Sequence, residues 1–257
     1  MNHYNTKEKL LEGKSIYGLI LPPKISESSI IKSIKEAGFE YVFIDLEHTP
    51  YSIESIETTI CVCRKYNLDP WIRIPGIYQH YIGRTLDLGA TGLIIPRVEQ
   101  ASQVEEIIKY SKFPPEGKRG FGGGRFRGFL PEGSIQEHCE WSNSNISIIV
   151  QFETKEALAN IDEIFSVKGI TGVLIGPCDL SISLGVPGEF NHPKVIETCR
   201  IILEKASSRN IPAGIVDSFQ SSKNWQKEGM QIFCFATLEL MILNEGKRLL
   251  KLFRNDK

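Results

Sequence analysis

The chain has 257 residues, with 30 Lys and Arg against 31 Asp and Glu, and a formal net charge of -1. This balance argues against a protein that binds nucleic acid through a basic surface. Hydrophobic residues make up 41% and charged residues 24%, a globular mix that argues against disorder. No stretch reaches the ~20 consecutive apolar residues of a membrane helix. The length fits two small domains or one α/β barrel, which runs to roughly 250 residues.

Six cysteines are scattered along the chain without a CxxC pair or a compact framework. In a chain of this length, that pattern favours free thiols in a reducing compartment. The first 14 residues are polar and lack the apolar middle region of a secretory signal. We therefore expect a cytoplasmic protein. The cysteines are Cys61, Cys63, Cys139, Cys178, Cys199 and Cys234.

Eight short apolar runs, rich in Ile, Val and Phe, recur from one end of the chain to the other. Most of them do not alternate between apolar and polar residues, which is typical of parallel strands buried on both faces. The runs are IYGLIL from Ile16, YVFID from Tyr41, PWIRI from Pro70, GLIIP from Gly92, SIIVQFE from Ser147, GVLIG from Gly172, PAGIV from Pro212 and IFCFA from Ile232.

A segment with helical periodicity follows each run. The first one, for example, places Ile30, Ile31 and Ile34 on one face. Eight strand–helix units demand parallel strands and predict a (β/α)8 TIM barrel, with an open doubly wound sheet as the alternative. No linker divides the chain, so residues 1–257 are expected to form a single domain. The helices are predicted over 26–37, 52–66, 79–88, 101–110, 154–165, 193–208, 219–227 and about 238–253.

One connection is much longer than the rest. Residues 113–144, between the fourth and fifth strands, read FPPEGKRGFGGGRFRGFLPEGSIQEHCEWSNS. A loop of this length inside a compact barrel is usually functional. Its Gly-Arg part, 119–128, resembles an RNA-binding tract, but such tracts are normally repeated and disordered. A lid whose arginines meet an anionic substrate is the better interpretation.

Polar side chains follow several of the apolar runs. In a barrel the active site lies at the C-terminal ends of the strands, so these side chains are expected to share one rim. They are Asp45, Glu47 and His48 after the second run, Arg73 in the third, Gln151 and Glu153 in the fifth, and Cys178 and Asp179 after the sixth.

Glu153 and Asp179 come from neighbouring strand ends and offer hard oxygen ligands. Two carboxylates with positions left over suit Mg²⁺ or Mn²⁺, whereas zinc would need a His/Cys cluster. Each acid taken singly could instead cap the helix that it precedes. The pair, with Arg73 and His48 nearby, favours a metal site.

His48 and Arg73 each have two interpretations. The histidine is either satisfied by local backbone or is an acid/base group whose ring Asp45 orients. A buried arginine needs an anion, because an unpaired buried charge is costly. Arg73 therefore pairs with Asp45 or Glu47, or it holds an anionic substrate. Spacing alone leaves both alternatives open.

Several reaction types lack their sequence signatures. None of the eight runs contains a lysine, which argues against a Schiff-base aldolase. There is no G-x-S-x-G elbow, no Walker loop and no strand-coupled G-x-G-x-x-G.

With these residues in place, the sequence resembles the HpcH/HpaI aldolase family, metal-dependent pyruvate aldolases related to citrate lyase beta chains. The resemblance runs from about Gly18 to Gly246. It is carried by AGFEYVFIDLEHTP, IRIPG, LDLGATGLIIPRVEQASQVEEII, FPPEGKRGFG, VQFETKEALANIDEI and VLIGPCDLSISLGVPGEFNHP, in that order.

The resemblance implies roles for individual residues. Glu153 and Asp179 match the family's ligands for a divalent metal, Mg²⁺ or Mn²⁺, with Co²⁺ as a further candidate. His48 matches the catalytic base and Asp45 its partner. The remaining matches line the substrate pocket: Arg73 at the ketone oxygen, Gln151 beside it, and Cys178 where relatives carry Ala or Asn. A homo-oligomer, hexamer or trimer, is also implied, often with exchange of a terminal helix.

The implied reaction is the reversible cleavage of a 4-hydroxy-2-oxo acid to pyruvate and an aldehyde. Departures from the family pattern in the Gly-Arg loop, at Ile20, at Cys178 and after the last strand leave the aldehyde unidentified. An acyl-CoA carbon–carbon lyase of the citrate lyase type is the alternative enzyme, and a barrel that binds a 2-oxo acid without turnover is the alternative outside enzymes.

Overall fold

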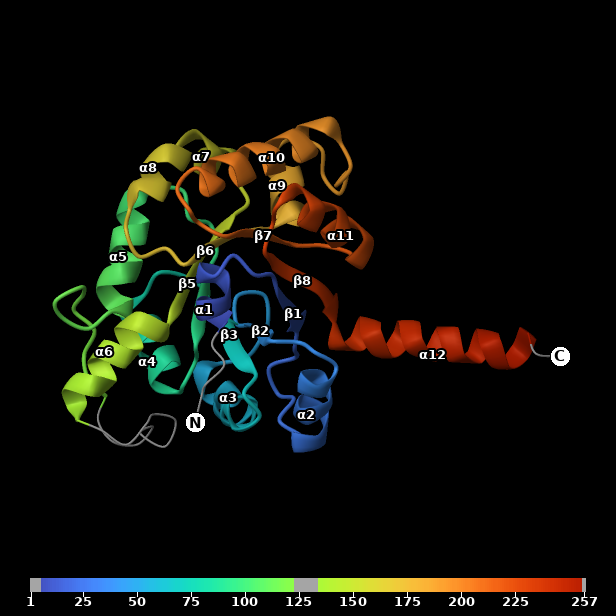
Figure 1. Cartoon of the computed structure of the whole chain (residues 1–257), viewed down its shortest axis with the longest axis horizontal. Helices are drawn as coiled ribbons and strands as arrows, with labels where there is room; N and C mark the ends of the chain where they lie inside the picture. The colour runs from blue at the N-terminus through green and yellow to red at the C-terminus, as the bar shows by residue number, and fades with distance from the viewer. Residues whose placement is uncertain (1–5, 123–133, 256–257) are drawn as a thin grey trace.

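The computed structural model of the chain describes residues 6–122 and 134–255 (Figure 1). Its strands form one closed barrel in chain order, and every neighbouring pair, including β8 with β1, is parallel. The predicted (β/α)8 barrel is confirmed, and the open sheet is excluded. The strands are β1 Ile16–Ile20, β2 Tyr41–Asp45, β3 Asp69–Arg73, β4 Gly92–Ile95, β5 Ser147–Phe152, β6 Gly172–Ile175, β7 Ala213–Val216 and β8 Ile232–Thr237.

The helices surround the barrel and differ from the predicted set in detail. The helix expected over 52–66 begins with a 3₁₀ turn, and the one expected over 154–165 is divided at Asn160, whose side chain donates to the Glu99 carbonyl oxygen at 2.7 Å. Helices α1, α6 and α9 were not predicted. The helices are α1 Thr6–Leu11, α2 Ser28–Glu36, η1 Ile53–Ile56, α3 Glu57–Lys65, α4 Gln79–Asp87, α5 Ala101–Ser111, α6 Ile135–Asn145, α7 Lys155–Ala159, α8 Ile161–Ser166, α9 Pro177–Ser183, α10 Pro193–Ser207, α11 Phe219–Glu228 and α12 Leu238–Asn255.

The long connection between β4 and β5 is partly helical. Its second half contains α6, which starts with a capping box between Ser134 and Glu137. Residues 123–133, which include most of the predicted Gly-Arg lid, lie outside the described residues. None of the described helices is long and apolar enough to cross a bilayer.

Aromatic side chains fill the lower part of the barrel interior. Here the lower end is the one at which the strands begin, and the upper end is the one at which they finish. Tyr41 and Trp71, on adjacent strands, stack with ring centroids 4.3 Å apart, and both are fully buried. Gly18 and Gly92 make room for them, because a Cβ atom at either glycine would lie within 2.5 Å of a ring atom. Helix α1 adds Leu10 to this cluster. The lower end of the barrel is therefore closed.

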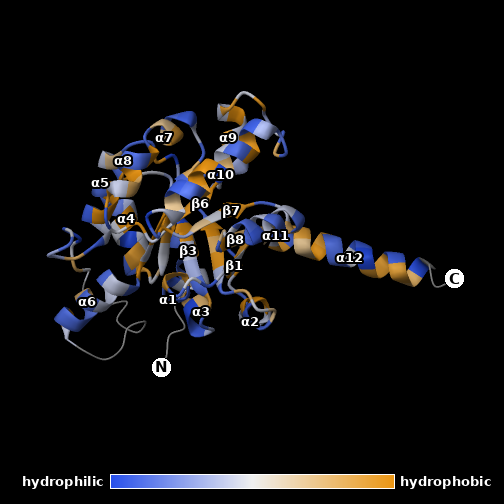
Figure 2. Cartoon of the chain, turned by 45° about the horizontal axis from the view of Figure 1, so that its top comes forward, coloured by the Kyte–Doolittle hydropathy of each residue, from blue (hydrophilic) through white to orange (hydrophobic). Residues whose placement is uncertain are grey.

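The last helix departs from the usual arrangement. In Figure 1, α12 projects away from the barrel instead of lying along it, and Figure 2 shows apolar and polar residues interspersed along its length. Only its start packs on the core, through Leu238 and Met241. The large apolar side chains it exposes are Leu240, Ile242, Leu243, Leu249, Leu250, Leu252 and Phe253.

Candidate active site at the upper rim of the barrel

Strand alternation carries the polar side chains to the upper end of the barrel. Along β2, Tyr41, Phe43 and Asp45 share one face because side chains alternate with a period of two. The parallel register then sets Asp45 directly opposite Arg73 of β3. On β5 the same alternation places Gln151, and Glu153 just beyond the strand, on the same side as buried Ile149. The interior thus changes from aromatic at the bottom to charged at the top.

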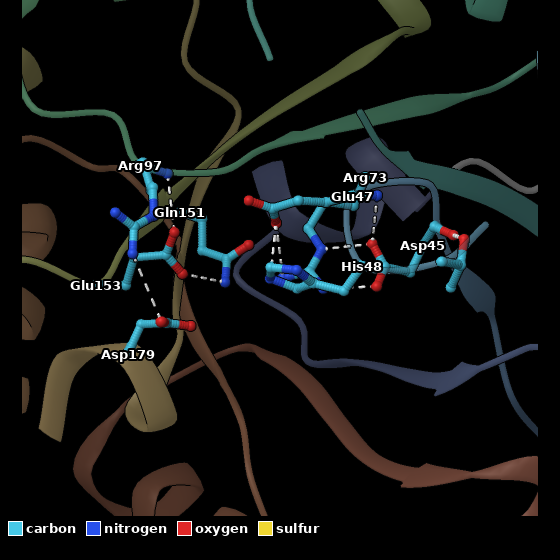
Figure 3. Close-up of polar contacts among 9 residues, drawn as sticks. Asp45, Glu47, His48, Arg73, Arg97, Gln151, Glu153 and Asp179 are labelled. Atoms are coloured by element: carbon cyan, nitrogen blue, oxygen red, sulfur yellow. Dashed lines mark hydrogen bonds and ion pairs between the residues drawn. The ribbon is translucent and has the colours of Figure 1, made fainter. Parts of the chain in front are cut away.

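Arg73 is the centre of a compact charged cluster (Figure 3). Its Nε and Nη2 donate to the two carboxylate oxygens of Asp45 at 2.8 and 2.7 Å, and its Nη1 lies 3.2 Å from Glu47 Oε2. Each of the three side chains is only 13–14% exposed. Arg73 therefore forms the ion pairs expected under the first alternative, with both acids, and its role toward a substrate stays a prediction.

The two acids of this cluster respond differently to the same arginine. Burial opposes ionisation of Asp45, but the two bonds from Arg73 hold the pKa of this carboxyl below its usual value. Burial raises the pKa of Glu47, although Arg73 and His48 oppose that rise. Burial likewise disfavours the charged form of Arg73, yet its bonds with Asp45 raise the arginine pKa. The guanidinium and Asp45 are both charged at neutral pH.

His48 contacts a different acid from the one expected. Asp45 was predicted to orient the imidazole ring, but its carboxylate is engaged by Arg73 and by the backbone N–H of Glu47 at 2.9 Å. The neighbour of His48 Nε2 is instead Glu47 Oε2, at 3.5 Å. Because Asp45 lies on the strand and His48 lies beyond its end, Glu47 is the better-placed acid. The His48 side chain is 64% exposed, so solvent reaches it.

Glu153 and Gln151 form a second, deeper cluster. Glu153 is 2% exposed and Gln151 is 3% exposed. Glu153 Oε1 accepts the backbone N–H of Arg97 at 2.9 Å, and its Oε2 accepts the Gln151 side-chain N–H at 2.5 Å. Gln151 Oε1 is buried without a hydrogen-bond partner. A buried carboxylate with so few donors is costly to ionise.

Asp179 lies beside this cluster, at the start of α9. Its Oδ1 is 3.7 Å from Arg97 Nη2, and its side chain is 36% exposed. Neither acid is the N-cap residue of a helix, although Asp179 lies in the first turn of α9. Thr154, not Glu153, caps α7 by accepting the Ala157 N–H, and Gly176, not Asp179, is the N-cap residue of α9.

The charge of these acids fits a divalent metal. Burial raises the pKa of Glu153 to about 7, and the negative charges of Asp179 and Glu47 add to that rise. Relieving such a pair by binding a cation is favourable, and carboxylate oxygens suit hard divalent ions. The described residues contain no group of three or more His, Cys, Asp or Glu arranged for a metal.

A glycine makes the approach of these groups possible. A Cβ atom at Gly176 would lie 2.7 Å from Gln151 Nε2 and 2.8 Å from Glu153 Oε2. Cys178, two residues later, exposes its thiol. Partial burial raises the pKa of this thiol, as do the nearby charges of Asp179 and Asp217. The thiol is therefore mostly protonated at neutral pH.

Two of the rim residues were not among the predicted site residues. Glu47 was considered only as a partner for Arg73. Arg97 was overlooked, although the strand-end rule would have found it two residues after β4. Conversely, Arg119 of the predicted lid is buried and bonds Asp87 at 2.6 Å, so its charge serves the fold instead of meeting a substrate.

The match to known families agrees with this geometry. The model of the HpcH/HpaI aldolase/citrate lyase family matches residues 23–232. The chain belongs to this family. That match covers β2 to β7 in full and ends at Ile232, the first residue of β8, and it includes every residue of the two clusters.

Two named relatives and one solved structure that resemble the chain over most of its length are aldolases. The chain is 34% identical over 244 residues to the hydroxypyruvate/pyruvate aldolase of Roseobacter denitrificans, covering 94% of this chain and 93% of the relative. It is 33% identical over 210 residues to the 2-keto-3-deoxy-L-rhamnonate aldolase of Escherichia coli K12, covering 82% and 78%. The crystal structure of an HpcH/HpaI aldolase from Desulfitobacterium hafniense superimposes with a TM-score of 0.88 at 30% identity, covering 97% and 96%.

These comparisons make this member of the family a class II pyruvate aldolase, an enzyme of the aldehyde-lyase type that cleaves 4-hydroxy-2-oxo acids. Aldolases of this class generally depend on a divalent metal. The predicted family and reaction class are confirmed.

Proposed function

We propose that the two rim clusters divide the aldolase reaction between them. Glu153 and Asp179 would hold the divalent ion, Mg²⁺ or Mn²⁺ with Co²⁺ as a further candidate. Arg73, fixed by Asp45 and Glu47, would bind pyruvate at its ketone oxygen, with Gln151 and Cys178 lining the pocket. The observation that carries this proposal is the placement of a charge-compensated arginine and an acid pair with excess negative charge at the one open end of the barrel.

The protein groups have distinct parts in the reaction. When bound, the metal supplies positive charge that polarises the ketone. Arg73 donates to the same oxygen and stabilises the enolate that forms there. His48 accepts a proton from the pyruvate methyl group, directly or through water. The enolate carbon then forms a bond to the aldehyde carbon, and the new alkoxide takes up a proton. Cleavage reverses these steps, so the C3–C4 bond breaks and the enolate is reprotonated.

The test is proton exchange at the pyruvate methyl group in D₂O, followed by NMR, with metal-stripped protein and added Mg²⁺ or Mn²⁺. It requires no knowledge of the aldehyde. We expect exchange that depends on the metal and disappears in His48→Ala. The matched control is His80→Ala, which removes an exposed histidine of α4 and should exchange like the parent.

One result would contradict the proposal. If folded, metal-loaded protein exchanged no methyl protons, the assignment of an enolate-forming site would be wrong. The acyl-CoA lyase and the binding barrel would then be the hypotheses to test, the first with a thioester substrate and the second by pyruvate binding without turnover.

We also propose that the chain works as a homo-oligomer, a hexamer or trimer, in which α12 packs on a second copy. An apolar groove runs beside β8 and is lined by aromatic residues, including Phe39, Phe219 and Phe235. The exposed apolar side chains of α12 would cover a groove of this kind. Light scattering tests this, because Leu249→Lys with Leu252→Lys should reduce the mass, whereas Lys247→Glu with Lys251→Glu on the same helix should not.

A cytoplasmic site of action is part of the same proposal. All six cysteines are free thiols, which suits a reducing compartment. Fractionation of the source cells tests this. Recovery of the protein from an oxidising compartment would contradict the proposal.

A further inference from the structure

The turn that follows β2 brings two acids and a histidine to the rim. Thr49 Oγ1 donates to the Asp45 carbonyl oxygen at 2.6 Å, and the Glu47 N–H donates to the Asp45 carboxylate at 2.9 Å. Local bonds of this kind between side chains and backbone stabilise a compact turn. The backbone positions from which the side chains of Glu47 and His48 project are therefore fixed.

Arg73 in turn holds the carboxylate of Glu47. The guanidinium donates to Asp45 through Nε and Nη2, and its remaining nitrogen, Nη1, lies 3.2 Å from Glu47 Oε2. A guanidinium is a planar fork, so bonds to two of its nitrogens also fix the third. The Glu47 side chain is only 14% exposed. This carboxylate is thus held between the turn and an arginine that Asp45 keeps in place.

His48 is the group that faces the held carboxylate. Glu47 Oε2 is buried and accepts no hydrogen bond within the described residues, and His48 Nε2 lies 3.5 Å from it (Figure 3). No other side chain in the described part of the chain bonds to the imidazole or pairs with it. A buried acceptor gains stability from a donor. Because the His48 side chain is 64% exposed, the ring has room to turn and supply one.

The contact determines which ring nitrogen can act as a base. An ionised carboxylate only accepts hydrogen bonds, so the ring nitrogen that faces Glu47 carries the proton of the neutral imidazole. With the proton on Nε2, the lone pair of Nδ1 is left to accept another. Uptake of that proton makes the ring a cation, which a neighbouring carboxylate stabilises.

We infer that Glu47 is a positioning residue for the proposed base: it accepts the Nε2–H of His48 and leaves Nδ1 to take up the proton of the pyruvate methyl group. The inference rests on the proposed function, because it takes His48 as the base. The methyl proton moves to Nδ1, and the electron pair of the C–H bond passes into the enolate. Glu47 thereby has the part that the family resemblance implies for Asp45, and Asp45 serves Arg73.

The first experiment locates the ring proton by ¹⁵N NMR of histidine-labelled protein with Mg²⁺ at pH 8, above the ordinary pKa of an imidazole. Protonated and unprotonated ring nitrogens have well-separated shifts. We expect the His48 proton on Nε2, as in His192, whose Nδ1 accepts the Lys194 N–H at 3.2 Å. In Glu47→Met, which removes the acceptor, the two His48 shifts should move towards their mean, because an exposed ring exchanges between both forms. The His192 shifts should not move.

The second experiment measures kcat and KM for methyl-proton exchange of pyruvate. Glu47→Met removes the charge and the acceptor, so kcat should fall by about 10²-fold. Glu47→Gln keeps an oxygen for Nε2–H and should fall by about tenfold, through loss of the charge alone. Glu47→Asp should recover part of the rate. In all three variants KM should stay close to that of the parent, because Arg73 keeps its bonds to Asp45.

A control and the parent separate this inference from the proposed function. Glu228→Gln removes a carboxylate from an exposed pair with Arg200 and should leave the spectrum and the kinetics as in the parent. Without exchange in the parent, the proposed function itself fails. With exchange in the parent, three results would overturn the role of Glu47: a His48 proton on Nδ1, His48 shifts that stay unchanged in Glu47→Met, or a raised KM at unchanged kcat.

Discussion

The two clusters at the rim bury similar carboxylates but treat them in opposite ways. Asp45 faces a guanidinium at 2.7–2.8 Å, and its pKa falls. Glu153 receives only a backbone N–H and an amide N–H and faces further acids, and its pKa rises to about 7. Burial alone would raise both values. The first cluster balances its charge within the protein, whereas the second holds negative charge that a cation would offset under the proposed function.

Glu153→Gln should have the largest effect on the second cluster. The amide keeps an oxygen for the Arg97 N–H but loses the charge that the metal needs. We expect metal binding to weaken by at least about 10²-fold and exchange to become undetectable. Because the buried charge is costly, the free energy of unfolding of the metal-free variant at pH 8 should not fall. Calorimetric titration and urea unfolding measure the two effects, and retained metal affinity would refute the ligand assignment.

The opposite cluster should respond differently to Arg73→Ala. This change removes a donor to the enolate oxygen, so the rate should fall by about 10²-fold or more. It also leaves Asp45 and Glu47 facing each other without a cation, so the free energy of unfolding should fall by about 3 kcal/mol. Arg73→Lys should rescue little, because one ammonium cannot replace the planar fork. Full turnover in Arg73→Ala would make the catalytic assignment wrong.

Lowering the pH should weaken metal binding by a smaller factor than these substitutions do. A pKa of about 7 for Glu153 means that metal competes with a proton at neutral pH. Affinity should therefore be about tenfold weaker at pH 6 than at pH 8. In the metal-free protein, rising pH has the opposite effect on the free energy of unfolding, which it lowers. Glu153 binds its proton more tightly in the folded chain, so its contribution to stability is lost as pH rises from about 4.5 to about 7. An affinity independent of pH would contradict this.

The smallest effect concerns Gly176. A methyl group there would meet Gln151 Nε2 and Glu153 Oε2, so Gly176→Ala should displace the ligand and weaken metal binding by about tenfold, about 1.4 kcal/mol. Gly83→Ala is the matched control, because nothing lies within 4 Å of its added atom on α4. That change should stabilise the fold by about 0.5–1 kcal/mol. Equal metal affinity in both variants would show that the space left by Gly176 does not affect metal binding.

Much of the fold could be predicted because it follows from local patterns. Continuous apolar runs locate parallel strands, and all eight were found. Short helices such as α9 were missed because seven residues give no clear period, and the break at Asn160 depends on a bond to the distant Glu99 carbonyl. The direction of α12 could not be predicted, since its apolar side chains find no cover within the described chain.

The site could be predicted as far as strand ends reveal it. Asp45, Arg73, Gln151 and Glu153 follow from the period-two alternation, which the register of β2 and β3 makes exact for the first pair. Beyond a strand end the alternation no longer sets the direction of a side chain, so it could not show that Glu47, with its Oε2 3.5 Å from His48 Nε2, would approach the ring. The strand-end rule would have placed Arg97 at the rim, but the direction of its side chain depends on a left-handed backbone conformation, which no spacing in the sequence indicates.

The stack of Tyr41 on Trp71 has a kinetic consequence. Because it closes the lower end of the barrel, both reactants must use the same entrance. Pyruvate, which the proposed function places beside the buried Gln151, then has to arrive first and leave last. In the cleavage direction the aldehyde should depart before pyruvate. Pyruvate should then inhibit competitively against the 4-hydroxy-2-oxo acid, since both bind the free enzyme, whereas the aldehyde should give a noncompetitive pattern.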